Sequence, residues 1–111
     1  MAIIDRGLLV SGTLHISDML NRTGSDLGYR RPVYHQAESI EFCSASVSHL
    51  MVSSHPANAA ICPFTIAVYS LHADPGKVYL AFRRIYLAGE AEKTSQVIFE
   101  LMDSIVRDVI E

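Results

Sequence analysis

Two alternating stretches in the second half of the chain constrain the fold most, because together they predict a β-hairpin. Residues 65–71 and 77–87 are rich in Val, Ile, Tyr and Phe, and their side chains alternate as in strands. Asp74-Pro75-Gly76 lies between them and suits a tight turn, since proline presets the first turn position and glycine accepts a positive φ. We therefore expect two antiparallel strands here.

Two further segments predict helices. Residues 91–111 carry one apolar stripe at helical spacing, consisting of Ile98, Leu101, Met102, Ile105 and Val109. Asp103 and Arg107 are four residues apart on the other side, where they can form an ion pair. Residues 45–54 predict a shorter helix, with Ser44 or Ser46 as its N-cap and His55-Pro56 as its stop.

The remaining segments give weaker patterns. We expect a strand over 8–15, a short helix that starts near Asp18 with Ser17 as its N-cap, a loop or edge strand over 29–39, a strand over 40–43 and a loop over 58–63. The order is then β-α-β-α-β-β-(β)-α. Grouped strands with helices on one face of the sheet indicate the α+β class rather than a doubly wound parallel sheet.

Composition indicates one folded domain over residues 1–111. Half of the residues are hydrophobic and 19% are charged, which is not the composition of a disordered chain. The net charge of −3 argues against general nucleic-acid binding, which needs a basic surface. No apolar run reaches membrane-spanning length, and the first residues do not resemble a signal peptide. We therefore expect a cytoplasmic protein with reduced thiols and no membrane or nucleic-acid partner.

Several short segments occur in a fixed order along residues 40–111. They are Ile40-Glu41-Phe42-Cys43, the helical residues 48–51, Pro56, Ile61-Cys62-Pro63, Ile66-Ala67-Val68-Tyr69, Asp74-Pro75-Gly76, Val78-Tyr79-Leu80-Ala81 and a long final helix. This order resembles the bacterial and archaeal family catalogued as domain of unknown function 302. The resemblance implies a TATA-binding-protein-like β-α-β4-α fold, often dimeric, and no established activity. It is confined to a core of about residues 40–111.

The same resemblance directs attention to the two cysteines. Some members of that family carry one cysteine at a strand end, often followed by Asn-Pro, and another just after a later proline. Cys43 matches the first position, although Ser44-Ala45 replaces Asn-Pro. Cys62 precedes Pro63, and Phe64 stands in the place after it.

Cys43 is the candidate reactive residue. It lies where a strand is expected to end and a helix to begin, so the positive end of the helix dipole is expected to lower its pKa. A nucleophilic or sulfur-carrying thiol would then be expected, with His49 as a nearby proton acceptor. The alternative is that Cys43 and Cys62 are both packed thiols that act as small apolar side chains.

Other candidates are polar residues near these cysteines. Ser44, Ser46 and Ser48 form a serine-rich helix entry. It can cap the helix over 45–54, or hold a small anion in a backbone-amide nest assisted by Arg83 or Arg84. His49 and His55 are six residues apart, on different faces of a continuous helix, so we assign no metal site. A soft-metal or haem site that also uses Met51 stays a weaker alternative.

The sequence thus predicts a small-ligand-binding or thiol accessory protein, with a sulfur-relay role among the options. Its cleft would lie near Cys43, with Ser44, Ser46, His49, Cys62 and Arg83 as ligand-binding residues. The alternative is a non-catalytic dimeric interaction module, in which the hairpin and the last helix face a second copy. No cofactor and no enzymatic reaction are assigned.

Overall fold

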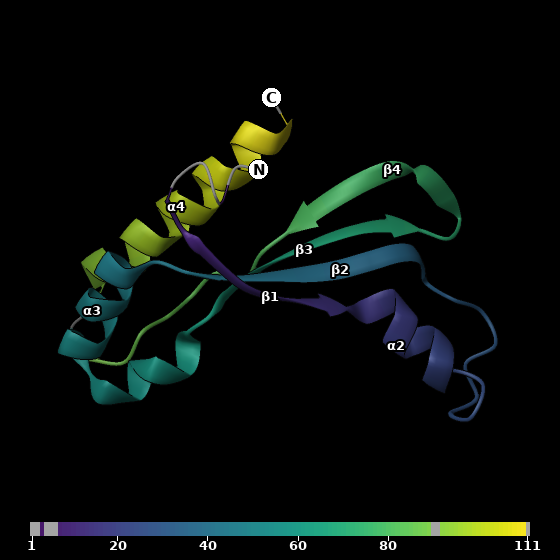
Figure 1. Ribbon diagram of the computed structural model, residues 1–111, viewed down its shortest axis with the longest axis horizontal. Helices are drawn as coiled ribbons and strands as arrows, with labels where there is room; N and C mark the ends of the chain where they lie inside the picture. Colours follow the sequence, from purple (N-terminus) through teal and green to yellow (C-terminus); the bar gives the residue numbers. More distant parts are fainter. Residues whose placement is uncertain (1–2, 4–6, 90–91, 111) are drawn as a thin grey trace.

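A computed structural model describes residue 3 and residues 7–89 and 92–110 of the chain. Along the chain the labelled elements are β1 (Leu9–His15), α2 (Ile16–Thr23), β2 (Tyr34–Cys43), α3 (Ala45–Ser54), the 3₁₀ helix η1 (Pro56–Ile61), β3 (Phe64–Leu71), β4 (Asp74–Ala81) and α4 (Glu92–Ile110). The four strands form one open antiparallel sheet in the order β1-β2-β3-β4 (Figure 1). The predicted α+β class is confirmed. Within the described ranges, no helix is long and apolar enough to cross a membrane.

The core lies at one end of this sheet. Phe42 of β2 and Phe64 of β3 are directly opposite in the register, so both side chains point to the same face. Helices α3 and α4 cover that face, and Figure 1 shows them grouped at one end of the molecule. The buried core consists of Ile3, Phe42, Val47, Met51, Phe64, Ile66, Ile98, Met102 and Ile105. Its large side chains pack at the end of the sheet where β2 ends with Cys43.

The other end of the sheet extends away from this core. Figure 1 shows α2 and the β3–β4 turn at the end opposite α3. The molecule measures 46 × 33 × 21 Å and has a radius of gyration of 16.1 Å. A compact domain of this length has a radius of gyration of about 13 Å. Part of the sheet therefore lies outside the volume that the helices enclose.

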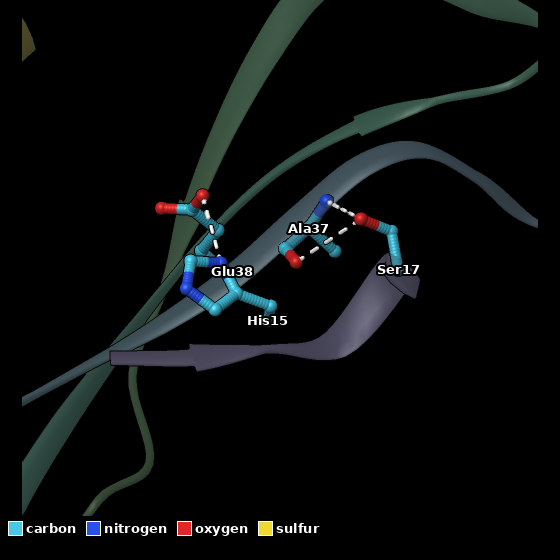
Figure 2. Close-up of polar contacts among 4 residues, drawn as sticks. All are labelled: His15, Ser17, Ala37 and Glu38. Atoms are coloured by element: carbon cyan, nitrogen blue, oxygen red, sulfur yellow. Dashed lines mark hydrogen bonds and ion pairs between the residues drawn. The ribbon is translucent and has the colours of Figure 1, made fainter. Parts of the chain in front are cut away.

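Helix α2 is fixed to β2 by one serine. The Ser17 hydroxyl accepts a hydrogen bond from the Ala37 backbone N–H (3.1 Å) and donates to its carbonyl (3.4 Å), as Figure 2 shows. The prediction that Ser17 caps this helix is wrong, because its hydroxyl is used by β2 and the N-cap residue is His15. His15 Nδ1 lies 3.3 Å from the Glu38 carboxylate in the same figure, but both side chains are exposed, so this pair contributes little.

Both predicted core helices are present. Helix α3 has the expected bounds, and Ser44 caps it by accepting a hydrogen bond from the Val47 N–H at 3.4 Å. The predicted stripe of α4 faces the core except at Val109, which is 58% exposed because the last turn extends past the packed sheet. Residues 91 and 111 of the prediction lie outside the described residues. Asp103 and Arg107 form the expected ion pair at 2.8 Å.

The hairpin is confirmed, but its turn was misplaced. Leu71 pairs with Asp74, so the turn consists of His72 and Ala73, and Pro75-Gly76 already belong to β4. Gly76 is not among the glycines with positive φ. Strand β4 ends at Ala81 rather than at residue 87. The chain after Ala81 leaves the sheet to pack against the core, where Phe82 contacts Phe99 of α4 at 5.9 Å between ring centroids.

Strand β2 was also underpredicted, since it begins at Tyr34 and not at residue 40. Its first half pairs with β3 through the backbone and reaches β1 only at Glu38, while most of its side chains are polar and exposed. An apolar alternation is absent there because the core helices α3 and α4 lie at the other end of the sheet. In place of the loop expected over 58–63, the chain forms η1, which begins with Pro56.

One buried asparagine ties η1 to α3 and to the segment that precedes α4. Asn58 is 2% exposed, and its Nδ2 donates to the carbonyls of Met51 (2.9 Å) and Ala88 (3.1 Å). The Ala88 N–H donates to Asn58 Oδ1 at 2.8 Å. Next in the chain, Gly89 has φ of +80° and would place a Cβ 2.7 Å from the Ser54 carbonyl, so only glycine fits this close approach. The end of α3 and the entry to α4 are thereby joined.

We expect Asn58→Ala to lower the free energy of unfolding by about 2–4 kcal/mol, because the buried Asn58 amide makes three hydrogen bonds to the backbone of Met51 and Ala88 that alanine cannot replace. Asn58→Asp should also destabilise the protein, since a carboxylate cannot donate to the two carbonyls. Urea unfolding measures the effect, with exposed Asn21→Ala as the matched control. Equal stability of the Asn58→Ala and Asn21→Ala proteins would contradict this role.

Candidate functional site

The register of β2 and β3 brings the two cysteines to the same end of the sheet. Cys43 is the last residue of β2, directly after Phe42. Cys62 precedes Pro63, to which it is joined by a cis peptide bond, and Phe64 follows as the first residue of β3. Because Phe42 pairs with Phe64, the two cysteines lie just outside this pair, Cys43 as the last residue of β2 and Cys62 two residues before β3. Both are half-buried free thiols.

The first turn of α3 supplies the polar surroundings of this thiol pair. The Ser48 hydroxyl is hydrogen-bonded to Cys62 Sγ at 3.2 Å. Ser44 is occupied by its capping bond, and its Oγ also lies 3.3 Å from the hydroxyl of Ser46. Within this serine-rich stretch, Ser44 caps the N-terminus of α3, and Ser48, one turn later, contacts the thiol of Cys62.

Burial raises the pKa of the Cys43 thiol above its ordinary value. The nearby Cys62 raises this pKa further, both through its charge and through a hydrogen bond, and Glu41 adds a smaller repulsion. A hydrogen bond from Ser11 acts in the opposite direction. The expected lowering of this pKa by the dipole of α3 is therefore wrong, because desolvation and the second thiol outweigh the favourable groups.

The position of Ser11 has a local cause. The register of β1 against β2 shifts between Val10 and Gly12, so Ser11 is the extra residue of a β-bulge. A bulge redirects a side chain that regular pairing would place elsewhere. Here it brings a hydroxyl to Cys43.

The other predicted residues are not drawn into this cluster. His49 is exposed, and His55 Nδ1 accepts a hydrogen bond from the Ala57 N–H at 3.0 Å, which makes it the N-cap of η1. Arg83 is exposed and makes no polar contact with any residue that the structure describes. In the described ranges, no group of three or more His, Cys, Asp or Glu side chains is placed to hold a metal ion.

Two hollows in the surface of the described residues lie away from the thiol pair. One, of about 530 Å³, lies between α2 and residues 24–34. The other, of about 450 Å³, lies beside residues 84–89 and the first turn of α4. Neither cysteine and none of Ser44, Ser46, His49 and Arg83 lines either hollow, while Arg84, the alternative to Arg83, lines the second. The ligand cleft expected at Cys43 therefore stays a prediction, and the geometry favours thiol chemistry there.

Sequence reasoning missed two side chains of the cluster. Ser48 was recognised only as part of a serine-rich helix entry, and its distance of 14 residues from Cys62 carries no motif. Ser11 lies in a β-bulge that the sequence did not predict. The glycine that follows, Gly12, is too weak a signal to locate a bulge.

Comparison of the chain with protein-family models, with curated proteins and with solved structures finds no match.

In the folded protein, we expect the pH at which Cys43 is alkylated at half its maximal rate to lie above that of the urea-unfolded chain, because its pKa is raised. Pulse labelling with iodoacetamide, followed by peptide mapping, measures each cysteine separately. Ser11→Ala should shift the Cys43 profile further upward, since it removes the hydrogen bond that lowers this pKa. A folded-state midpoint below that of the unfolded chain would show that the helix dipole prevails.

Proposed function

We propose that the chain is a thiol accessory protein whose Cys43 and Cys62 interconvert between a dithiol and an intramolecular disulfide. The observation that carries this proposal is the meeting of two cysteines, 19 residues apart, at one sheet end in a chain with no other cysteine. We place the protein in the cytoplasm, where the dithiol is the resting form.

The oxidant in this proposal is a low-molecular-weight disulfide, RSSR. One protein thiol loses its proton and attacks a sulfur of RSSR, which forms a mixed disulfide and releases one RS⁻ that takes up a proton. The second protein thiol then attacks the protein sulfur of the mixed disulfide and releases the second RS⁻. The protein has lost two hydrogen atoms, and RSSR has become two RSH.

The surroundings of each thiol suggest the order of attack. Cys43 holds its proton because its pKa is raised, so it is the poorer first nucleophile at neutral pH. Cys62 has the Ser48 hydroxyl within hydrogen-bond distance of its sulfur. Cys62 therefore attacks first, and Cys43 resolves the mixed disulfide. This order reverses the role that the sequence suggested for Cys43.

A second candidate function, a homodimeric interaction module, is favoured by the exposed surface. The chain has 7630 Å² of accessible surface. A folded monomer of this mass has about 6,100 Å², so roughly 1,500 Å² is in excess. A standard interface takes about 800 Å² from each partner, so a second copy of the chain would account for about half of this excess.

The proposed dimer surface is the sheet face opposite α3 and α4, which we call the open face. Leu14, Ser39, Ala67 and Ala81 form one row across its four strands. Leu14 and Ala81, on the two edge strands, are exposed. The small side chains of this row let a second sheet approach closely. A TATA-binding-protein-like fold, which the family resemblance implied, stays a prediction beside this dimer.

We expect oxidation of the reduced protein in a glutathione redox buffer to form a disulfide within one chain. The intact mass measured under denaturing conditions should then be that of a single chain less two hydrogen atoms. Cys43→Ser and Cys62→Ser should instead accumulate a mixed disulfide with one glutathione, because the resolving partner is missing. Ser53→Ala, at an exposed position of α3, serves as a matched control that keeps both thiols and the Ser48 hydroxyl. If wild type forms only mixed or intermolecular disulfides, the two thiols do not form a functional pair.

We expect the wild-type chain to sediment as a dimer and the Leu14→Lys/Ala81→Lys protein as a monomer, because two buried lysines would oppose close packing of the open face. Leu50→Lys changes an exposed leucine on α3 and should leave the dimer intact. A monomeric wild type, or a dimer that survives the double substitution, would remove this surface from consideration. This outcome is independent of the disulfide test, since each variant retains both cysteines.

A further inference from the structure

The cavity of about 530 Å³ between α2 and residues 24–34, here called the α2 cavity, lies at the end of the molecule away from the core. Its volume falls within the usual range for small-molecule sites, about 300–1,000 Å³. The apolar part of its lining includes Leu20, Leu27, Tyr29 and Val33. The last three are between 66% and 73% exposed, which is unusual for large apolar side chains gathered in one place.

The charged side chains that line the cavity are all positive. Arg30 and Arg31 both line the cavity, and no Asp, Glu, Lys or His side chain does. Neither arginine forms an ion pair with a described residue. The whole chain carries a net charge of −3, so the positive charge of the cavity lining is opposite in sign to that of the protein as a whole. An arginine guanidinium binds a carboxylate through two parallel hydrogen bonds, which makes a carboxylate the fitting anion.

The walls of the cavity are held in place before any ligand binds. The Tyr29 N–H donates to the Gly24 carbonyl at 2.8 Å and the Leu27 N–H to the Thr23 carbonyl at 3.2 Å, which fold the loop onto the end of α2. At its far end, the Val33 carbonyl accepts a hydrogen bond from the His72 N–H at 2.9 Å. A preformed site binds with a smaller loss of conformational entropy than a loop that must first fold.

The base of α2 and the aromatic wall add to this rigidity. Ser17 fixes the first turn of the helix to β2 through its two bonds to Ala37 (Figure 2). Tyr34 lines the cavity and stands edge-on to Tyr69, with 5.5 Å between the ring centroids. Tyr69 is in turn stacked on Tyr79 at 5.1 Å. The aromatic wall is thus part of a ladder across three strands.

From these features we infer that the α2 cavity is a binding site for a small amphipathic carboxylate, with an apolar body and one carboxylate group. The apolar body lies against Leu20, Leu27 and Val33, and the carboxylate pairs with Arg30 and Arg31. This site is separate from the thiol pair, so its occupancy does not require either cysteine.

The test uses decanoate as the probe, with decanol as its uncharged analogue, titrated into ¹⁵N-labelled wild-type protein. We expect saturable chemical-shift changes that centre on residues 17–34, and binding of decanol weaker by at least about tenfold, since it lacks the charged partner. Absence of saturable changes with decanoate, equal affinity for decanol, or changes that centre on the open face would overturn the inference.

A matched pair of double variants tests the role of the arginines. Arg30→Gln/Arg31→Gln should weaken decanoate binding by at least about tenfold and leave decanol binding unchanged. Arg83→Gln/Arg84→Gln removes the same charge from a region outside the cavity and should leave decanoate affinity within about twofold of wild type. If both double variants weakened decanoate binding equally, the binding would depend only on the net charge of the protein, and the proposed site would be wrong.

Discussion

The pairing of Phe42 with Phe64 is the contact on which the rest of the structure depends. It places two aromatic side chains on one face of β2 and β3, with 5.9 Å between their ring centroids. Met51, Ile98 and Met102 pack with them in a fully buried cluster. A shift of one residue in this register would turn both rings to the open face, so the core strongly specifies the pairing. The same register determines which residues meet just beyond the rings, and these are the two cysteines.

Local signals predicted the elements whose boundaries depend on local chemistry. The bounds of α3 followed from a capping serine and a His-Pro stop, and the apolar stripe of α4 followed from spacing alone. The turn was misplaced because Asp74-Pro75-Gly76 has strong turn chemistry, whereas the pairing of β3 with β4 requires the chain to reverse two residues earlier. The first half of β2 was missed because most of its side chains are polar where the sheet extends beyond the core helices α3 and α4.

The sequence predicted which cysteines belong to the candidate site better than it predicted their chemistry. Cys43 and Cys62 were both identified, but their proximity is a property of strand register, which a separation of 19 residues does not encode. The sign of the pKa shift at Cys43 was missed for the same reason, since it depends on burial, Cys62 and a bulge residue from β1. Asn58 gave no signal, because a single asparagine in a short segment has the same appearance in sequence whether its amide is solvated or buried.

The concentration of the core at one end of the sheet separates two kinds of sequence constraint. Residues around Phe42, Asn58 and Gly89 are constrained by packing, hydrogen bonding and backbone conformation, and few substitutions preserve them. Residues 18–33 contribute almost nothing to that core, so their side chains can change with little effect on folding. A chain built in this way can acquire new recognition properties at one end while the other end continues to specify the fold.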